Sequence, residues 1–203
     1  MFTGQTFMFA NPFWRIKFRG LEKVSKKDKG VIFIGNHQSF MDMPVFSRLP
    51  FKMKWVSKKE LFKIPVVGWL MKMSGHVSID RGKKTAIQSM YGIVKYVKGN
   101  VPVMVFPEGT RSRDGLLKPF KNGAFIIAEE HDVTLQPIVL YGTNKLMRPG
   151  TWKISHIFGK IDVSVLDPIY PKDFNSFEEI RDYAQKVMQE ELDRLTNLRI
   201  QNA

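Results

Sequence analysis

Two short polar blocks, each following an apolar run, contain the side chains that could do chemistry. The first block reads NHQSFMD at 36–42 and places His37 five positions before Asp42. The second reads FPEGTRS at 106–112 and contributes Arg111 on a glycine-containing turn. A base with a carboxylate partner and a cationic turn that fits a phosphate indicate one site. Such a site would take a proton from a hydroxyl while holding a phosphate group.

His37 and Asp42 can act together only if the chain turns between them. Five residues on a regular helix correspond to about 140° of rotation, so the two side chains would not share a helix face. If a turn brings them together, Asp42 accepts the Nδ1 proton of His37 and leaves Nε2 to take a proton from an alcohol. The chain has no cysteine, and Ser39 has no second base of its own. The pair therefore suits a substrate hydroxyl better than a protein nucleophile, although a loop histidine bonded to a nearby carboxylate has the same spacing.

The second block has the composition of an anion-binding turn. Gly109, with Thr110 after it, allows the backbone N–H groups to turn inward. Arg111 offers a planar fork to phosphate oxygens. Glu108 would repel a phosphate, so we expect it to face a substrate hydroxyl or a basic residue. The alternative is an ordinary polar turn with a surface arginine.

Further cations follow two other short apolar segments. Lys58 and Lys59 follow one, and Arg81 follows Ile79-Asp80. Taken singly, these are equally typical of solvated lysines and a surface ion pair. We find no metal-ligand cluster and neither glycine-rich nucleotide fingerprint, which argues against metal chemistry, nucleotide hydrolysis and hydride transfer.

The elements that must position these blocks alternate between strand and helix patterns. Strands are predicted at 14–19, 31–35, 54–57, 77–79, 103–106, 134–140 and 161–166. Helices are predicted at 41–49, 85–98, 122–130 and from a Ser176-x-x-Glu179 capping box onward, whereas Pro65 and Gly68 break the pattern at 61–73. This alternation predicts a single α/β domain with a mixed, mainly parallel sheet flanked by helices. Ligands of such sheets bind at the carboxyl ends of the strands, which is where both blocks fall.

The length and the charge of the chain indicate how many domains it forms and what kind of partner it binds. The 203 residues suit one domain over 14–203, preceded by an apolar segment at 1–13 that either packs on the core or contacts a membrane. No uninterrupted apolar stretch is long enough for a transmembrane helix. The net charge is +13, and residues 1–100 alone carry 19 Lys/Arg against 5 Asp/Glu. This charge favours an anionic partner: a bilayer, a nucleic acid or a phosphorylated substrate.

Taken together, the blocks resemble the 1-acylglycerol-3-phosphate acyltransferases of the glycerolipid and lysophospholipid acyltransferase family. The first is similar to the family's NHxxxxD block and the second to its FPEGTRS block. Two more motifs fit: Lys58 to Leu61 with Pro65, Gly68 and Ile79-Asp80-Arg81, and the proline-centred segment Gln136 to Val139. Four short motifs in the family's order are far more specific than any one of them. Gln136 departs from the family, which more usually has an apolar residue there.

The resemblance implies an enzyme of phospholipid biosynthesis. It would move a fatty acyl group from acyl-CoA or acyl-carrier protein to the sn-2 hydroxyl of lysophosphatidate, giving phosphatidate without a cofactor. In this reading His37 is the base and Asp42 orients it. The remaining residues would bind the acceptor: Arg111, Lys58 and Arg81 at the glycerol phosphate, and Glu108, Gly109 and Thr110 around its pocket.

The resemblance also implies a partner surface. We expect association with an anionic membrane at the cytoplasmic face of the cell membrane, peripheral or shallowly inserted. Family members often have apolar helices before the first block, whereas 35 residues precede Asn36 here. The lipophilic segment 61–73, flanked by lysines, is the expected lining of an acyl groove.

Three rival readings remain. The first is a related acyltransferase with another acceptor, such as glycerol-3-phosphate or another lysophospholipid, or a transacylase that uses phospholipid as donor. The second is a non-enzymatic basic module that binds membranes or nucleic acid. It would give the His37–Asp42 pair no role, and we expect no nucleic acid partner. A serine hydrolase is disfavoured because the chain has no GxSxG elbow.

Overall fold

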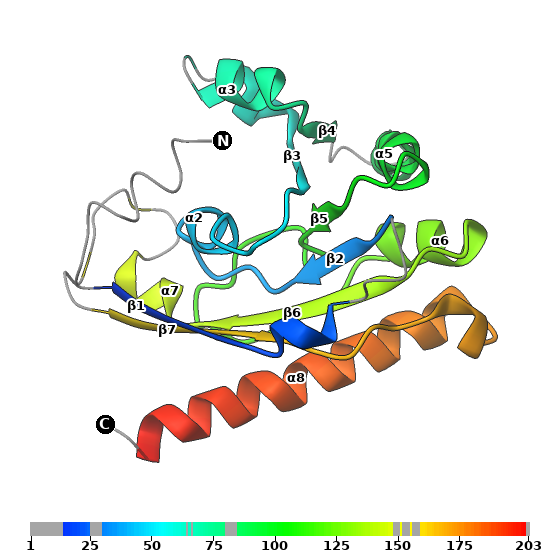
Figure 1. The fold of residues 1–203 in the computed structure, drawn as a ribbon. Coiled ribbons are helices and arrows are strands. Elements are labelled where there is room, and N and C mark those ends of the chain that lie inside the picture. Colours follow the sequence, from blue (N-terminus) through cyan, green and yellow to red (C-terminus); the bar gives the residue numbers. More distant parts are fainter. Residues whose placement is uncertain are drawn as a thin grey trace.

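The protein, described by a computed structural model over residues 14–24, 30–63, 65, 67–79, 85–147, 151, 155 and 159–201, forms an α/β domain (Figure 1). The predicted segment 1–13 lies outside these residues. The strands are β1 (Trp14–Arg19), β2 (Ile32–Gly35), β3 (Lys54–Lys58), β4 (Val77–Ile79), β5 (Val103–Val105), β6 (Leu135–Tyr141) and β7 (Gly159–Val165). The α-helices are α2 (Asp42–Phe46), α3 (Val67–Met73), α4 (Thr85–Met90), α5 (Val94–Lys98), α6 (Gly123–Glu130), α7 (Thr143–Leu146) and α8 (Phe177–Gln201). Short 3-10 turns are η1 (Leu21–Lys23), η2 (Lys59–Lys63), η3 (Tyr91–Ile93) and η4 (Pro171–Asp173).

The strands form one seven-stranded sheet in the order β1-β7-β6-β2-β5-β3-β4. Only the β6–β7 pairing is antiparallel, so β1 and β7 run against the other five strands. The predicted mixed, mainly parallel sheet is thus confirmed. The central strand β2 lies between β5 and β6, which makes its carboxyl end the middle of one edge of the sheet.

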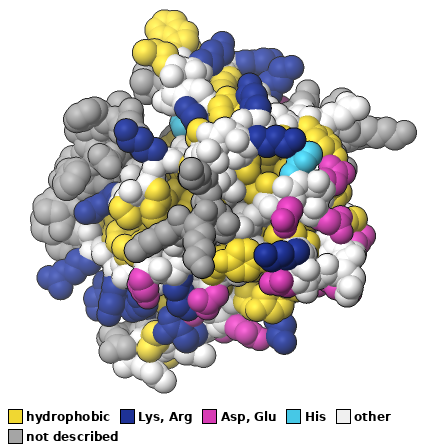
Figure 2. Space-filling model, turned by 45° about the vertical axis from the view of Figure 1, so that its right-hand side comes forward, with side chains coloured by type: hydrophobic (Ala, Val, Ile, Leu, Met, Phe, Trp, Pro, Cys, Tyr) yellow, Lys and Arg dark blue, Asp and Glu magenta, His cyan; other side chains and the backbone are white. Residues whose placement is uncertain are grey.

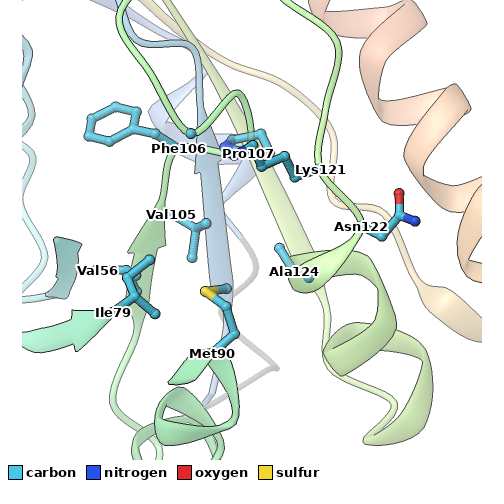
Figure 3. Close-up of a pocket in the computed structure, with 11 residues that line it drawn as sticks. Val56, Ile79, Met90, Val105, Phe106, Pro107, Lys121, Asn122 and Ala124 are labelled. Carbon is cyan, nitrogen blue, oxygen red and sulfur yellow. The ribbon is translucent and has the colours of Figure 1, made fainter. Parts of the chain in front are cut away.

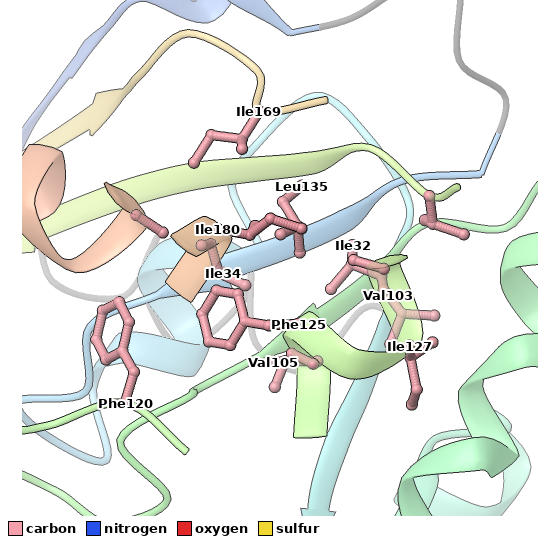
Figure 4. Close-up of a cluster of buried hydrophobic side chains, with 14 of the residues drawn as sticks. Ile32, Ile34, Val103, Val105, Phe120, Phe125, Ile127, Leu135, Ile169 and Ile180 are labelled. Carbon is pink, nitrogen blue, oxygen red and sulfur yellow. The ribbon is translucent and has the colours of Figure 1, made fainter. Parts of the chain in front are cut away.

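Both faces of this sheet are covered, which explains why its central strands read as continuous apolar runs. Along β2, Ile32 and Ile34 point into a core that α6 and α8 close (Figure 4). Phe33 points to the opposite face, into a second core that includes Phe46 of α2. In Figure 1, α8 runs along one face of the sheet, with α2 and α7 on the other.

The long helix α8 begins as the capping box predicts, because Glu179 N–H donates to Ser176 Oγ at 3.3 Å. The reciprocal bond differs: the Glu179 carboxylate accepts from Asn175 N–H at 3.0 Å. Its buried residues are Ile180, Ala184, Met188, Leu192 and Leu195. Met188 is fully buried, whereas its neighbour Val187 is partly exposed.

The single helix predicted over 85–98 is wrong, because the chain passes through α4, η3 and α5. The 3-10 turn contains Gly92, and glycine costs about 1 kcal/mol in a helix interior relative to alanine. The predicted break in 61–73 is confirmed as the junction between η2 and α3. In the ranges given above, no helix is both long and apolar enough to span a bilayer.

Candidate active site

The two polar blocks lie side by side because β2 and β5 are parallel neighbours. Ile34 is in register with Val105, so both blocks begin at the same edge of the sheet. Two hydrogen bonds then join them. His37 N–H donates to Glu108 Oε1 at 2.7 Å, and Ser112 N–H donates to the His37 carbonyl at 2.8 Å. The backbone of the histidine and the backbone next to Arg111 therefore belong to one site.

A turn brings His37 and Asp42 into contact, as their chemistry required. Asp42 is the first residue of α2, and its Oδ2 lies 2.7 Å from His37 Nδ1. The same oxygen accepts the N–H groups of Gln38 and Ser39 at 2.7 and 2.9 Å. Thr143 Oγ1 donates to the other oxygen, Oδ1. Since three donors besides the imidazole converge on this buried carboxyl group, it acts as the acceptor and Nδ1 carries the proton.

The imidazole is also held by its face. Its ring stacks on Phe106 with centroids 4.0 Å apart and planes inclined by 11°. Phe106 is packed in turn against Phe46 of α2 and Trp55 of β3, at centroid distances of 6.1 and 6.0 Å. The His37 side chain remains 16% exposed. With Nδ1 committed to Asp42, Nε2 is the nitrogen left to meet a ligand.

Three polar side chains to which the sequence analysis gave no role form hydrogen bonds around this turn. These bonds join it to β6 and to the residues directly after β6. Asn36 exchanges two hydrogen bonds with the backbone of Leu140, at 2.8 and 2.7 Å. Gln38 accepts from Gly142 N–H at 3.2 Å, just before Thr143. Like the predicted residues, Thr143 follows the end of a buried strand. A search for polar side chains after every predicted strand would therefore have found it.

Glu108 joins the two blocks through backbone groups, and the charge of Lys118 acts on its carboxyl group. Its side chain is buried, and its two oxygens accept the backbone N–H groups of His37 and Lys118 at 2.7 and 3.1 Å. Burial raises the pKa of Glu108 from 4.5 to about 7. The two backbone hydrogen bonds lower this pKa and the nearby charge of Asp42 raises it further. The carboxyl group thus ties the two blocks together.

The turn after Glu108 gathers three cations. Gly109 has φ +69°, and a Cβ there would lie 2.8 Å from Lys121 Cε, so the turn requires glycine. Thr110 is exposed and Arg111 is partly buried. Lys118 Nζ donates to the Arg111 carbonyl at 3.1 Å. Lys118 and Lys121 were not predicted, although both follow the block closely in sequence.

Of the other two cations predicted to bind the phosphate, the structure describes Lys58. Lys58 ends β3, next to β5, and is exposed. Among the described residues it makes no ion pair with either block. Arg81 lies outside the described residues, so its role stays a prediction.

An apolar pocket of about 370 Å³ opens beside Phe106 (Figure 3). Phe106 and Pro107 lie at one end and Met90 at the other. The lining residues come from β3, β4, α4, β5 and the start of α6: Val56, Ile79, Met90, Val105, Phe106, Pro107, Gly109, Lys121, Asn122, Gly123 and Ala124. None of these described residues belongs to 61–73, the segment expected to line an acyl groove. The arrangement offers a base, a cationic turn and an apolar pocket within one edge of the sheet.

Comparison with known proteins agrees with this chemistry. Residues 15–141 match the model of the Acyltransferase family. The chloroplastic 1-acyl-sn-glycerol-3-phosphate acyltransferase of Brassica napus is 39% identical over 160 residues, 78% of this chain and 46% of that protein. The 1-acyl-sn-glycerol-3-phosphate acyltransferase of Helicobacter pylori is 34% identical over 173 residues, 82% of this chain and 72% of that protein. The crystal structure of the 1-acyl-sn-glycerophosphate acyltransferase PlsC from Thermotoga maritima superposes with a TM-score of 0.82 at 31% identity, over 95% of this chain and 76% of that one. The chain spans about half the length of the chloroplastic relatives.

Proposed function

The chain belongs to the 1-acyl-sn-glycerol-3-phosphate acyltransferase family, and we propose that it acylates the sn-2 hydroxyl of lysophosphatidate to give phosphatidate. One observation carries this proposal. The hydrogen bond from His37 to Asp42 leaves Nε2 as a base beside a cationic turn and an apolar pocket. A hydroxyl, a phosphate and an acyl chain are the three groups that this reaction must bring together.

The chemical step requires a proton acceptor and a route for the leaving thiol. His37 Nε2 takes the proton of the sn-2 hydroxyl as its oxygen attacks the thioester carbonyl carbon. Asp42 stabilises the imidazolium that forms, because its carboxyl group already accepts from Nδ1. The tetrahedral intermediate then breaks its C–S bond, and the imidazolium returns the proton to the departing thiolate. No acyl-enzyme forms, and the proton count balances within the site.

The acceptor phosphate is proposed to bind at the glycine turn. Arg111 provides a bidentate fork, and Lys58 and Arg81 add charge from neighbouring segments. Thr110, exposed on the turn, would contribute its hydroxyl. Gly109 and Glu108 would shape the pocket that receives this phosphate. Glu108 acts there through the backbone of His37 and Lys118, because both of its oxygens are already engaged.

The donor's acyl chain is proposed to occupy the pocket next to Phe106. Its lining is almost wholly apolar, apart from Lys121 and Asn122. Phe106 forms part of this lining and also stacks on His37. A chain seated there would bring its thioester to the imidazole. Both acyl-CoA and acyl-carrier protein can present such a chain.

Association with an anionic membrane surface is part of the same proposal. The acceptor and the product are lipids, and the net charge of +13 favours anionic headgroups.

The direct test is acyl transfer by purified protein. Lysophosphatidate, glycerol-3-phosphate and lysophosphatidylcholine would be offered with palmitoyl-CoA and palmitoyl-acyl-carrier protein, using wild type and His37→Ala. We expect phosphatidate from lysophosphatidate with at least one donor, and a rate about 10²–10⁴-fold lower for His37→Ala. Equal rates for the two proteins would remove the proposed base. Turnover of another acceptor alone would keep the mechanism and change the substrate.

A further inference from the structure

Helix α3 holds two large apolar side chains in solvent on one face. Trp69 is 68% exposed and Met73 is 86% exposed, and their spacing of four residues puts them on the same side of the helix. Gly68 and Met71 point the other way and are buried. A Cβ at Gly68 would lie 2.1 Å from the carbonyl oxygen of Phe62, so α3 packs on η2 without room to roll. The close packing at Gly68 leaves Trp69 and Met73 on the side of α3 that faces solvent.

Exposed lysines lie on this helix and on the segment that precedes it. Lys58, Lys59, Lys63 and Lys72 are all exposed, and Glu60 is the only acidic residue among the described positions of 52–79. In that part of the chain none of the four lysines forms an ion pair. Figure 2 shows hydrophobic side chains projecting at the top of the molecule, where Figure 1 places α3, next to a group of Lys and Arg side chains. We refer to Trp69, Met73 and these four lysines as the α3 surface.

The α3 surface lies on the same side of the sheet as the candidate active site. Turn η2 begins at Lys59, directly after the carboxyl end of β3. β3 is the parallel neighbour of β5, whose carboxyl end leads into Phe106 and the glycine turn. A flat partner that touches α3 would therefore approach the strand-end edge where the site opens.

We propose that the α3 surface docks on an anionic bilayer, with Trp69 and Met73 entering the interfacial region and the lysines contacting lipid headgroups. Tryptophan favours the membrane interface, and lysines near the surface are attracted to an anionic leaflet. Apolar insertion and a basic cluster together supply the two signals that stable peripheral binding needs. This inference rests on the proposed function, because a lipid acceptor requires the site to meet a membrane.

Charge argues against a second copy of the chain as the partner. A two-fold contact through this face would bring the four lysines of each copy together, with a single glutamate on each side to offset them. An acidic protein would satisfy the lysines, and the experiment below separates it from a lipid surface.

The experiment is co-sedimentation with vesicles of phosphatidylcholine alone and of phosphatidylcholine mixed with phosphatidylglycerol. The test variant is Trp69→Ser/Met73→Ser. Its matched control is Ile200→Ser, which removes a side chain that is 69% exposed on α8, on the opposite side of the molecule. We expect the double variant to bind mixed vesicles at least about tenfold more weakly, because it loses the apolar area that the two side chains would bury in the bilayer. The Ile200→Ser control should bind like wild type.

A charge variant checks the second half of the inference. Lys63→Glu/Lys72→Glu should weaken binding to mixed vesicles and leave weak binding to pure phosphatidylcholine unchanged. Unaltered sedimentation of either double variant would overturn the proposal. So would a wild-type protein that binds acyl-carrier protein or self-associates through α3 but does not bind vesicles.

An activity measurement separates this proposal from the proposed function. With lysophosphatidate dispersed as monomers and no vesicles present, Trp69→Ser/Met73→Ser should turn over like wild type. With vesicle-borne acceptor it should be slower by the same factor as its loss of binding. Vesicle binding by a wild-type protein without acyl transfer would refute the function and leave the docking surface standing. Equal loss of activity in both assays would refute the docking role.

Discussion

The candidate active site and the α3 surface both combine aromatic side chains with cations, but the two regions expose these side chains in opposite ways. At the strand ends, Phe106 is stacked on His37, and the polar groups of the two blocks are joined by hydrogen bonds. On α3, Trp69 projects into solvent and the neighbouring lysines have no acidic partner among the described residues.

The difference separates positioning from contact. A paired, buried group has one geometry, which is what a proton transfer needs. An exposed group that is not paired within the protein can still form its interactions with another molecule. Variants at the strand ends should therefore lower the rate however the acceptor is presented. Variants on α3 should act only when the acceptor lies in a bilayer.

Asp42→Asn should give the largest effect and tests the buried half of this contrast. An amide cannot accept from all four donors that surround Asp42, and it no longer stabilises the imidazolium. We expect the rate to fall about 10²–10⁴-fold. The measurement is kcat with monomeric and with vesicle-borne lysophosphatidate. A loss confined to vesicles would contradict the assignment.

Arg111→Ala should follow, because it removes the proposed phosphate ligand. A hydrogen bond to a charged group contributes about 1.5–3 kcal/mol, so kcat/KM for lysophosphatidate should fall about 10–100-fold. The matched control is Arg113→Ala, two residues along the same loop and exposed. Equal losses for the two variants would indicate a general charge effect in place of a defined phosphate site.

Thr143→Val tests whether the hydrogen bond that Asp42 Oδ1 accepts from Thr143 contributes to the rate. Valine has the shape of threonine but cannot donate to Oδ1, whereas Thr143→Ser can. We expect kcat to fall about tenfold for valine with KM unchanged, and to recover with serine. If both variants lose activity equally, the side chain acts through packing instead.

Glu108→Gln should have the smallest effect and shows in stability rather than rate. Folding raises the pKa of Glu108 from 4.5 to about 7, so between these pH values the folded chain binds more protons than the unfolded chain. The stabilising contribution is complete below pH 4.5 and is lost as the pH rises through 7, with a slope of up to about 1.4 kcal/mol per pH unit. Glutamine does not titrate. Urea unfolding at several pH values should show this slope in wild type minus variant, and a flat difference would mean that Glu108 is ionised throughout.

Local patterns in the sequence predicted much of the sheet. The bounds of β1 and β4 coincide with those predicted, because strand alternation and a short run between breakers are local signals. Helix geometry showed that His37 and Asp42 could meet only if the chain turned between them, and the structure contains that turn. The break at η3 was missed because the apolar spacing over 85–98 continues through Gly92.

Contacts that depend on strand order were beyond the sequence. Thr143 reaches Asp42 across 101 positions only because β6 lies beside β2. The same holds for Asn36 and Leu140, 104 positions apart. Hydropathy marked 61–73 as lipophilic, but it could not tell that Trp69 and Met73 face solvent while Val56, Val105 and Met90 line the pocket.

The central claim is that His37 and Asp42 act as one unit, and a double-mutant cycle tests it most directly. The rates of His37→Ala, Asp42→Asn and the double variant would be measured with monomeric lysophosphatidate. If Asp42 works through the imidazole, the double variant should be no slower than His37→Ala alone. Losses that multiply would mean that the carboxyl group acts independently of His37, and the proposed base would lose its partner.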